Sequence, residues 1–287
     1  MKKVILIIVL IGVVLGIYHI YFRDIEGNKL ITEEYKNSES YINNLYYSDE
    51  YFKMNILSEE EQMMYDIIIK NTIEETREVY IPCANDCSSK MQRVIDSIYL
   101  DHPEFLAFKG IGSWWILNNQ IKYNNYYSFS KRKSNLASRR IERIMEDIRK
   151  DTKDMDEKDK ILYVYNYVAS HNYDKLFTYD KSNQSAYSFF SGGKSVCAGF
   201  AKASQMIFQN IGIKSYLVLT TNHMFNYVEY EGKYYIFDAT YGTSFRNKTD
   251  YRYYDGLGNS TTGAVLGLYS EHYPKIETTK LKDIFDL

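Results

Sequence analysis

Cys197, His223 and Asp238 are the residues of this 287-residue chain whose types could together support covalent catalysis. A cysteine thiolate attacks an amide or acyl carbonyl carbon, and an imidazole holds the displaced proton and returns it to the leaving amine. A carboxylate fixes the imidazole tautomer and stabilises its charged form. The three residues follow in the order Cys, His, Asp, with spacings of 26 and 15 residues. Whether they meet depends on the elements that carry them.

The stretch "GGKSVCAGFAKASQMIFQNIGI" predicts a helix over about 196–209 that begins at the cysteine. Ser195 is the expected N-cap, which puts Cys197 in the first turn, where unpaired N–H groups and the helix dipole favour a thiolate. Gly192 and Gly193 would let the chain turn sharply and a substrate backbone come close. The alternative is a buried structural cysteine. The expected buried stripe consists of Val196, Phe200, Ala203 and Ile207.

A hairpin is expected around Glu231-Gly232, which lies between the alternating runs "HMFNYVEY" and "KYYIFDAT". If these two residues form the loop, Tyr230 faces Lys233 across the pair of strands. A four-residue loop preserves the assignment of side chains to sheet faces, whereas a three-residue loop reverses it.

The two-residue loop pairs Asp238 with Phe225, so His223 lies on the same sheet face as Asp238, one diagonal step away. Diagonal neighbours are about 7–8 Å apart at the backbone, within reach of a hydrogen bond between the two side chains. The alternatives are a structural histidine and a turn aspartate at a strand end. Both alternatives are less favoured, because they would require His223 and Asp238 to share a sheet face by chance.

These residues resemble the transglutaminase-like superfamily, which has a papain-like fold. The resemblance covers roughly residues 155–245. Where this chain has Phe200 the family often has Trp or Tyr, and where it has Phe225 the family often has Trp. "DHPEF" at 101–105 and the helices before it resemble the region ahead of this domain in secreted clostridial-type members. The motifs that carry the resemblance are "VCAGFA" at 196–201, "HMFNYV" at 223–228 and "DATY" at 238–241.

The resemblance implies an α+β fold in which a nucleophile helix packs on an antiparallel sheet, with a mainly helical region before it. It also implies catalytic roles for Cys197, His223 and Asp238, and no cofactor. The backbone N–H of Cys197 is well placed to stabilise the oxyanion. Family members add a side-chain donor from a position ahead of the nucleophile, and Gln184 and Tyr187 are the polar candidates.

Three functions remain open from the sequence. The first is a cell-surface cysteine acyltransferase that forms a thioester with a glutamine side chain, which lysine or water then resolves. The second is a cysteine peptidase or amidase acting on surface protein or cell-wall peptides. The third is a non-catalytic binding module on the same fold. In each case the partner is a protein or peptide at the cell surface or cell wall.

Other classes of function find no support in the sequence. The net charge of −2 and pI of about 6.2 include no basic excess of the kind that nucleic-acid binding needs. The five His and three Cys have no spacing that fits a zinc site, so no metal is expected. No nucleotide-binding G-x-x-x-x-G-K loop occurs.

The N-terminus carries its own signal. Lys2 and Lys3 precede an apolar run from Val4 that extends to about Phe22. This pattern predicts a membrane-spanning signal anchor over 1–23, with the rest of the chain outside the cell. A cleaved secretory signal is the alternative, although no A-x-A cleavage site follows. Residues 24–56 are polar and are expected to form a stalk.

The remaining chain is divided into a mainly helical region at 57–150 and a catalytic domain at 151–287. Ser58 and Glu61 form a capping box, which predicts a helix over about 59–78. A second helix is expected to end before Pro103, followed by strands near 114–130. Further helices are expected at 134–150 and 156–170, ahead of the nucleophile helix and the antiparallel strands.

Cys83 and Cys87 lie four residues apart, in a polar turn expected between two helices. A single turn can bring their Cα atoms within the distance that a disulfide needs. Outside the cell such a bond is allowed, and it would leave Cys197 as the single free thiol. The alternative is two reduced thiols.

Overall fold

The computed structural model of the chain describes residues 51–174, 181–192, 194–244, 248–250, 252–260 and 269–287. Residues 48–287 form one compact unit. The predicted membrane anchor at 1–23 and the predicted stalk as far as residue 50 lie outside the described residues. Among the described residues, no helix has the length and apolar character needed to cross a bilayer.

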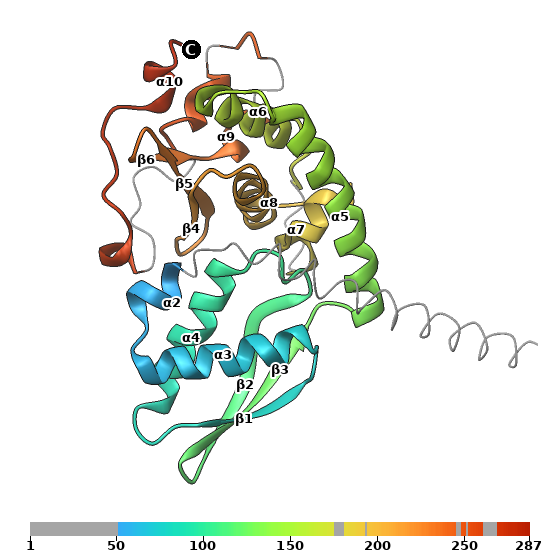
Figure 1. Cartoon of the computed structure of the whole chain (residues 1–287), viewed down its shortest axis with the longest axis vertical. Coiled ribbons are helices and arrows are strands. Elements are labelled where there is room, and N and C mark those ends of the chain that lie inside the picture. Colours follow the sequence, from blue (N-terminus) through green and yellow to red (C-terminus); the bar gives the residue numbers. More distant parts are fainter. Residues whose placement is uncertain (1–50, 175–180, 193, 245–247, 251, 261–268) are drawn as a thin grey trace, which may run out of the picture. The chain divides into compact units, whose positions relative to one another are not determined.

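The first part of the compact unit combines helices with a three-stranded antiparallel sheet of strand order β1-β3-β2. Helices α3 and α4 lie side by side against the sheet (Figure 1) and enclose a core with buried side chains from β1 and β3. The elements in this part are α2 (Tyr51–Ile56), α3 (Glu59–Ile73), β1 (Glu78–Pro82), α4 (Cys87–Asp101), β2 (Phe108–Leu117) and β3 (Gln120–Tyr127).

Strand β1 corrects the helix predicted over 59–78. The capping box at Ser58 and Glu61 is present, but α3 ends at Ile73 and the chain then becomes extended. In β1, Ile81 is buried while its neighbours are exposed, as expected for a strand with one face on a core. The partner that stabilises it is β3, about forty residues later, with Ile81 opposite Ile121. Helical periodicity at the end of α3 could not reveal that pairing.

Helix α2 corrects the end of the predicted stalk. The Asp101 carboxylate accepts hydrogen bonds from the backbone N–H groups of Phe52, at 2.9 Å, and Lys53, at 3.0 Å. The Phe52 side chain is buried in one cluster with Leu100, Ala198 and Ala201. A six-residue helix is marginal alone, so these tertiary contacts account for its presence.

Cys83 and Cys87 form a disulfide whose Cα atoms are 5.9 Å apart. The bond joins the residue after β1 to the first residue of α4, rather than lying between two helices as the sequence suggested. Both cysteines are buried in the core of this part of the unit. Because the closed loop is short, its main effect is local, fixing the start of α4 relative to the sheet.

Alkylation of the unreduced protein should therefore modify one cysteine, Cys197, because it is the free cysteine of the structure. Mass spectrometry after iodoacetamide treatment, with and without prior reduction, would measure this count. Three modified cysteines without reduction would contradict the disulfide but leave the site at Cys197 unaffected. A bridge that included Cys197 would contradict a catalytic role for that thiol.

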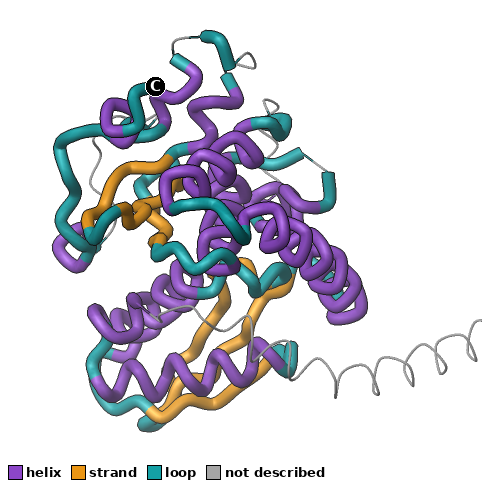
Figure 2. Tube along the Cα trace, turned by 45° about the horizontal axis from the view of Figure 1, so that its top comes forward, coloured by secondary structure: helices purple, strands orange, loops and turns teal. Residues whose placement is uncertain are grey.

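The second part of the unit places helices around the antiparallel sheet β4-β5-β6. Helix α8 lies against this sheet, as Figure 2 shows, and its residues from 198 to 208 are buried. The elements are α5 (Lys131–Thr152), α6 (Glu157–Ala169), η1 (Lys181–Gln184), α7 (Ala186–Phe190), α8 (Cys197–Asn210), β4 (Ser215–Leu219), β5 (Met224–Tyr230), β6 (Lys233–Phe237), α9 (Ala239–Thr243), η2 (Tyr253–Gly256), η3 (Ser270–His272) and α10 (Leu281–Ile284).

Helix α5 runs across the predicted domain boundary at 150/151. Its buried stripe belongs to the same core as α6, α8 and β6, so the helix packs on the second part of the unit along much of its length. The members of the stripe recur every three or four residues, as expected for one face of an amphipathic helix. They are Ala137, Ile141, Met145 and Ile148.

A buried network of amide and hydroxyl groups fixes α8 on the sheet. The Asn226 side chain in β5 donates to the Ala201 carbonyl at 3.1 Å and to Gln205 Oε1 at 3.3 Å. The Gln205 side chain in turn donates to the backbone carbonyl of Ser215 in β4 and accepts from its hydroxyl at 2.9 Å. Because buried polar groups are costly when unpaired, this network specifies one position of the helix on the sheet.

Candidate active site

The first residue of α8 is Cys197, and its side chain is half-buried. Val196 is the N-cap and supplies no side-chain cap, which corrects the expectation that Ser195 caps the helix. Ser195 instead holds the preceding loop, with its carbonyl accepting from Asp174 N–H at 2.8 Å and its hydroxyl within 3.0 Å of the Ser188 hydroxyl. A Cβ at position 199 would lie 2.0 Å from Ser195 Oγ, so the close approach of this loop to the first turn requires Gly199.

The register predicted for the β5–β6 hairpin is confirmed. Tyr230 pairs with Lys233, and the ladder continues to Asn226 opposite Phe237. Glu231 and Gly232 have φ values of 51° and 75°, which are the positive values that a two-residue hairpin turn requires.

His223 lies immediately before β5, and Asp238 immediately after β6. Because of the register, the two side chains meet, with His223 Nε2 2.8 Å from Asp238 Oδ2. His223 also forms a side-chain hydrogen bond with Cys197. Since Nε2 faces the carboxylate, Nδ1 is the nitrogen left to face the sulfur. The structure thus brings together the three residues that the sequence analysis singled out.

The Asp238 carboxylate is 1% exposed and accepts hydrogen bonds at both of its oxygens. Oδ2 accepts from His223 and from the Ser260 hydroxyl, at 3.0 Å. Oδ1 accepts from the Thr240 backbone N–H, at 3.1 Å, and from the Thr240 hydroxyl. Asp238 is also the N-cap of α9, so one carboxylate both orients the imidazole and begins a helix. The sequence offered no means of identifying Ser260, which is 22 residues downstream.

Electrostatics at the site favour a thiolate–imidazolium pair. Burial by itself raises the pKa of Cys197, but hydrogen bonding and charge attraction with His223 outweigh it and lower the pKa below its ordinary value. The opposite holds for His223, where burial lowers the pKa but the hydrogen bond and charge of Asp238, together with Cys197, raise it to about 9. At a pH between the lowered pKa of Cys197 and the His223 pKa of about 9, the sulfur is a nucleophilic thiolate and the imidazole carries the proton that a leaving amine needs.

Tyr173 is a site residue that the sequence analysis missed. Its hydroxyl accepts a hydrogen bond from the Cys197 backbone N–H, at 3.3 Å, and also bonds the Cys197 side chain. Tyr173 reaches this place because it forms a parallel bridge with Ser195, just before the nucleophile. The Met224 backbone also hydrogen-bonds the thiol. A tyrosine 24 residues before the cysteine is one of thirty in the chain, so its type alone gave no signal.

The two side-chain donors expected from the sequence lie elsewhere. Tyr187 belongs to α7, and its ring packs on Phe129, with a centroid distance of 4.9 Å, and under the ammonium of Lys133. Gln184 belongs to η1, and among the described residues no hydrogen bond joins its side chain to Cys197, His223 or Asp238. Tyr173 thus occupies the place beside Cys197 that was expected for one of these two.

A residue from the first part of the unit also approaches the nucleophile helix. The ring of Tyr99 in α4 lies under Lys202 of α8, whose Nζ is 3.4 Å from the ring centroid. Tyr99 is close enough to Cys197 for the thiolate charge to contribute, after burial, to raising its pKa to about 12. Lys202 is 4% exposed. Burial lowers the pKa of its amine to about 7, although the nearby Glu104 carboxylate opposes this.

Replacing Lys202 with methionine should stabilise the protein near neutral pH. The unfolded chain has an ordinary lysine pKa of about 10.4, so between pH 7 and that value it binds more protons than the folded chain. The free energy of unfolding of the unmodified protein should therefore rise with pH across this window. We expect Lys202→Met to be more stable by about 1–4 kcal/mol at pH 6.5, with a smaller difference at pH 9.5.

Urea unfolding at the two pH values would measure this difference. Lys150→Met is the matched control because Lys150 is exposed, and it should change neither stability nor its pH dependence. A difference between Lys202→Met and the unmodified protein that stayed the same at both pH values would contradict a depressed lysine pKa.

No group of three or more His, Cys, Asp or Glu in the described part of the chain is arranged to hold a metal ion.

Part of the chain is similar to known proteins. Residues 143–254 match the family model described as "Transglutaminase-like superfamily", a segment that includes Cys197, His223 and Asp238. No curated protein sequence matches the chain. A solved structure titled "Crystal structure of a TGase" is similar at 16% identity and a TM-score of 0.33, covering 57% of this chain. The similarity spans 50% of the length of that structure.

Proposed function

We propose that the protein is a cysteine acyltransferase or amide hydrolase that acts on protein or peptide substrates through Cys197, His223 and Asp238. The observation that carries this proposal is the arrangement at His223, which bonds a buried carboxylate at 2.8 Å on one side and a thiol on the other. The match of residues 143–254 to the transglutaminase-like model is consistent with it.

In the proposed reaction, the Cys197 thiolate attacks the carbonyl carbon of an amide, and the carbonyl π electrons move to the oxygen. The Cys197 backbone N–H and the Tyr173 hydroxyl are positioned to donate to that oxyanion once their mutual hydrogen bond is exchanged for the substrate. The imidazolium of His223 then protonates the leaving nitrogen, and the C–N bond breaks to leave a thioester. An amine or water, deprotonated by His223, attacks the thioester and releases Cys197.

A non-catalytic binding module on this fold is the less favoured alternative. Binding alone would not require a buried aspartate that accepts hydrogen bonds at both of its carboxylate oxygens. It would also not require one of the donors to be an imidazole that contacts a thiol. The choice between transfer and hydrolysis depends on which acceptor reaches the thioester, and the triad is the same for both.

The test is incubation of the purified protein with a glutamine-containing protein and a fluorescent primary amine. Covalent incorporation of the amine indicates acyl transfer. Release of ammonia without incorporation indicates deamidation, and new amino termini indicate proteolysis. Cys197→Ala is the control, and an outcome in which the unmodified protein gives none of these products would contradict the proposal.

We also propose that the protein acts outside the cytosol, at the cell surface. The apolar run after Lys2 and Lys3 and the Cys83–Cys87 disulfide support this location, because structural disulfides persist mainly in oxidising compartments. Protease added to intact cells or protoplasts should digest the protein while sparing a cytosolic marker. Complete protection of the protein under those conditions would contradict the location.

A further inference from the structure

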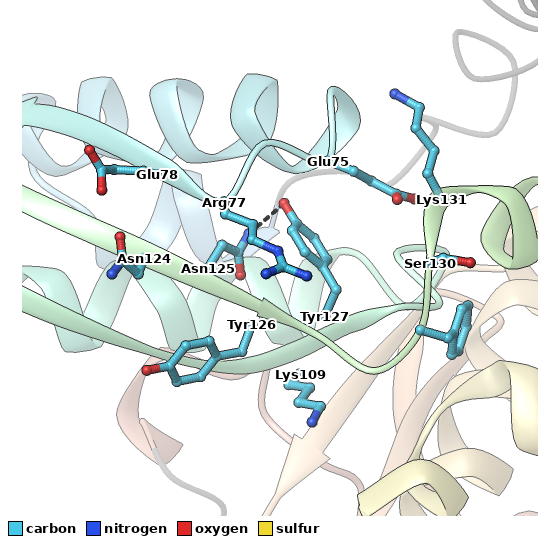
Figure 3. A pocket seen from close by; sticks show the side chains of 11 residues that line it. Glu75, Arg77, Glu78, Lys109, Asn124, Asn125, Tyr126, Tyr127, Ser130 and Lys131 are labelled. Atoms are coloured by element: carbon cyan, nitrogen blue, oxygen red, sulfur yellow. Dashed lines mark hydrogen bonds between the residues drawn. The ribbon is translucent and has the colours of Figure 1, made fainter.

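We propose that a cavity beside the β1–β3–β2 sheet binds a carboxylate-bearing stretch of the peptide or protein substrate, at a distance from the reactive amide. This inference rests on the proposed function and names a chemical feature of its substrate. The cavity has a volume of ≈ 860 Å³ and lies between the α3–β1 connection, the strands and the start of α5. Figure 3 shows the side chains that line it, drawn from all of these elements.

The acidic groups that line the cavity are already compensated. Glu78 forms an ion pair with Lys122 at 2.7 Å and accepts from the Tyr80 hydroxyl at 3.1 Å. Glu75 is half-buried, which raises the pKa of its carboxyl, and it interacts with the Ser134 side chain and with Lys131. Neither acid is therefore a strong site for a cationic ligand.

Two cations that line the cavity are not compensated in this way. The side chains of Arg77 and Lys109 form no ion pair or hydrogen bond with any described residue. Arg77 is nevertheless fixed at its backbone, because its carbonyl accepts from the Asn125 N–H at 2.8 Å. An arginine whose backbone is fixed and whose guanidinium has no partner among the described residues offers two parallel N–H donors to a carboxylate.

Hydrogen bonds hold two of the lining side chains, Asn125 and Tyr127, in place. The Asn125 side chain donates to the hydroxyls of Thr72, at 3.1 Å, and Tyr127, at 3.0 Å. The Tyr127 hydroxyl in turn donates to the Thr76 carbonyl at 3.1 Å. A ligand would therefore meet a preformed surface, which lowers the entropy cost of binding.

The size and polarity of the cavity favour a peptide segment over a small anion or a polyanion. Its volume falls in the range of sites for ligands of several residues or a small molecule, and is too large for a lone phosphate or acetate. The exposed ring of Tyr126 and the Asn124 side chain can contact a peptide backbone. The two uncompensated cations, Arg77 and Lys109, match one or two carboxylates rather than the many charges of a polyanion.

The walls of the cavity continue into elements that flank the nucleophile. Lys109 lines the cavity, and the next residue, Gly110, packs on the ring of Tyr99, leaving no room for a Cβ there. Tyr99 in turn contacts Lys202 of the nucleophile helix. The cavity residue Phe129 also packs against Tyr187 of α7, with the two rings tilted by 51°. These contacts connect the lining of the cavity to α8, the helix that carries Cys197, and to α7.

The test uses the full chain carrying Cys197→Ala, so that binding is measured without turnover. The probe is the peptide Gly-Gln-Gly-Glu-Glu-Gly with a neutral fluorophore, compared with the same peptide in which both Glu are Gln. Fluorescence anisotropy should show affinity at least about tenfold higher for the acidic peptide, and Arg77→Gln or Lys109→Gln should each remove most of that preference. Lys150→Gln, an equal charge change on an exposed lysine away from the cavity, should leave it intact. The preference should also weaken with added salt.

Equal affinity for both peptides, or an acidic preference that survives Arg77→Gln and Lys109→Gln together, would overturn the inference. Thermal unfolding of each variant shows whether its fold is intact. Because Arg77 is exposed, Arg77→Gln should leave the fold intact. If the acidic preference is present but the unmodified protein forms no product from any amide substrate, the proposed function fails and the cavity assignment stands. If the protein is active but indifferent to the two Glu residues, only the cavity assignment fails.

Discussion

Cys197 is expected to react with iodoacetamide at pH 6 about 10- to 100-fold faster than the same cysteine in a His223→Ala variant. A thiol of ordinary pKa, about 8.5, is less than about 1% ionised at pH 6. His223 lowers the pKa of Cys197, so a larger fraction of the thiol should be ionised at pH 6 in the unmodified protein than in the variant. The gain is smaller than the change in ionised fraction, because a thiolate of lower pKa is also less nucleophilic.

The pH profile separates this explanation from simple accessibility. In the unmodified protein the alkylation rate should level off at a lower pH than in His223→Ala, because His223 lowers the pKa of Cys197. In His223→Ala the rate should keep rising to about pH 9. His171→Ala is the matched control, because His171 bonds the Tyr167 carbonyl, and it should keep the unmodified profile. Identical profiles for all three proteins would refute the catalytic assignment of Cys197 and His223.

Asp238→Asn should lower kcat/KM by about 10³- to 10⁴-fold. The carboxylate holds the proton on Nε2 of His223, which leaves Nδ1 to serve the thiol. Asparagine that presents its NH₂ to His223 would favour the opposite tautomer. If the asparagine turned its oxygen to His223 instead, its NH₂ would face the backbone N–H and the hydroxyl of Thr240, which both donate to Asp238 in the unmodified protein. Neither orientation of the amide therefore satisfies His223 and Thr240 together. We therefore also expect a loss of about 1–3 kcal/mol in the free energy of unfolding.

Activity measured well below the unfolding midpoint in urea would separate the two effects. Ser260→Ala removes one donor to Asp238 but leaves the His223 contact, so it should lower kcat/KM less than Asp238→Asn does. Asp250→Asn, which alters an aspartate paired with Arg252 in an exposed loop, should change neither quantity. An Asp238→Asn protein with near-normal kcat/KM would show that the carboxylate does not orient the imidazole.

Local patterns were sufficient to predict the parts of the site that depend on short-range geometry. The positive φ values at Glu231 and Gly232 follow from the turn that the sequence indicated, and the turn fixes which residues of β5 and β6 share a face. The helix that begins at Cys197 was visible from its periodicity. His223 and Asp238 could be placed on one face because strand register is a matter of counting.

Features that depend on distant contacts could not be predicted in this way. Tyr173 reaches Cys197 through a bridge to Ser195, and Tyr99 approaches α8 from a separate helix. Strand β1 is stabilised by pairing with β3, and α2 by the Asp101 carboxylate. Each of these depends on a partner between 22 and 103 residues away, about which the local composition carries no information.

The buried amine of Lys202 provides a natural probe of motion between α4 and α8. A lysine that is 4% exposed can react with an acetylating reagent in solution only when the packing around it opens, and the Tyr99 ring of α4 is part of that packing. The rate at which a mild acylating reagent modifies Lys202, compared with an exposed lysine such as Lys150, would therefore report how often the two helices separate. Substrates that bridge both parts of the unit would slow this modification, so the same measurement could detect substrate engagement before any bond is broken.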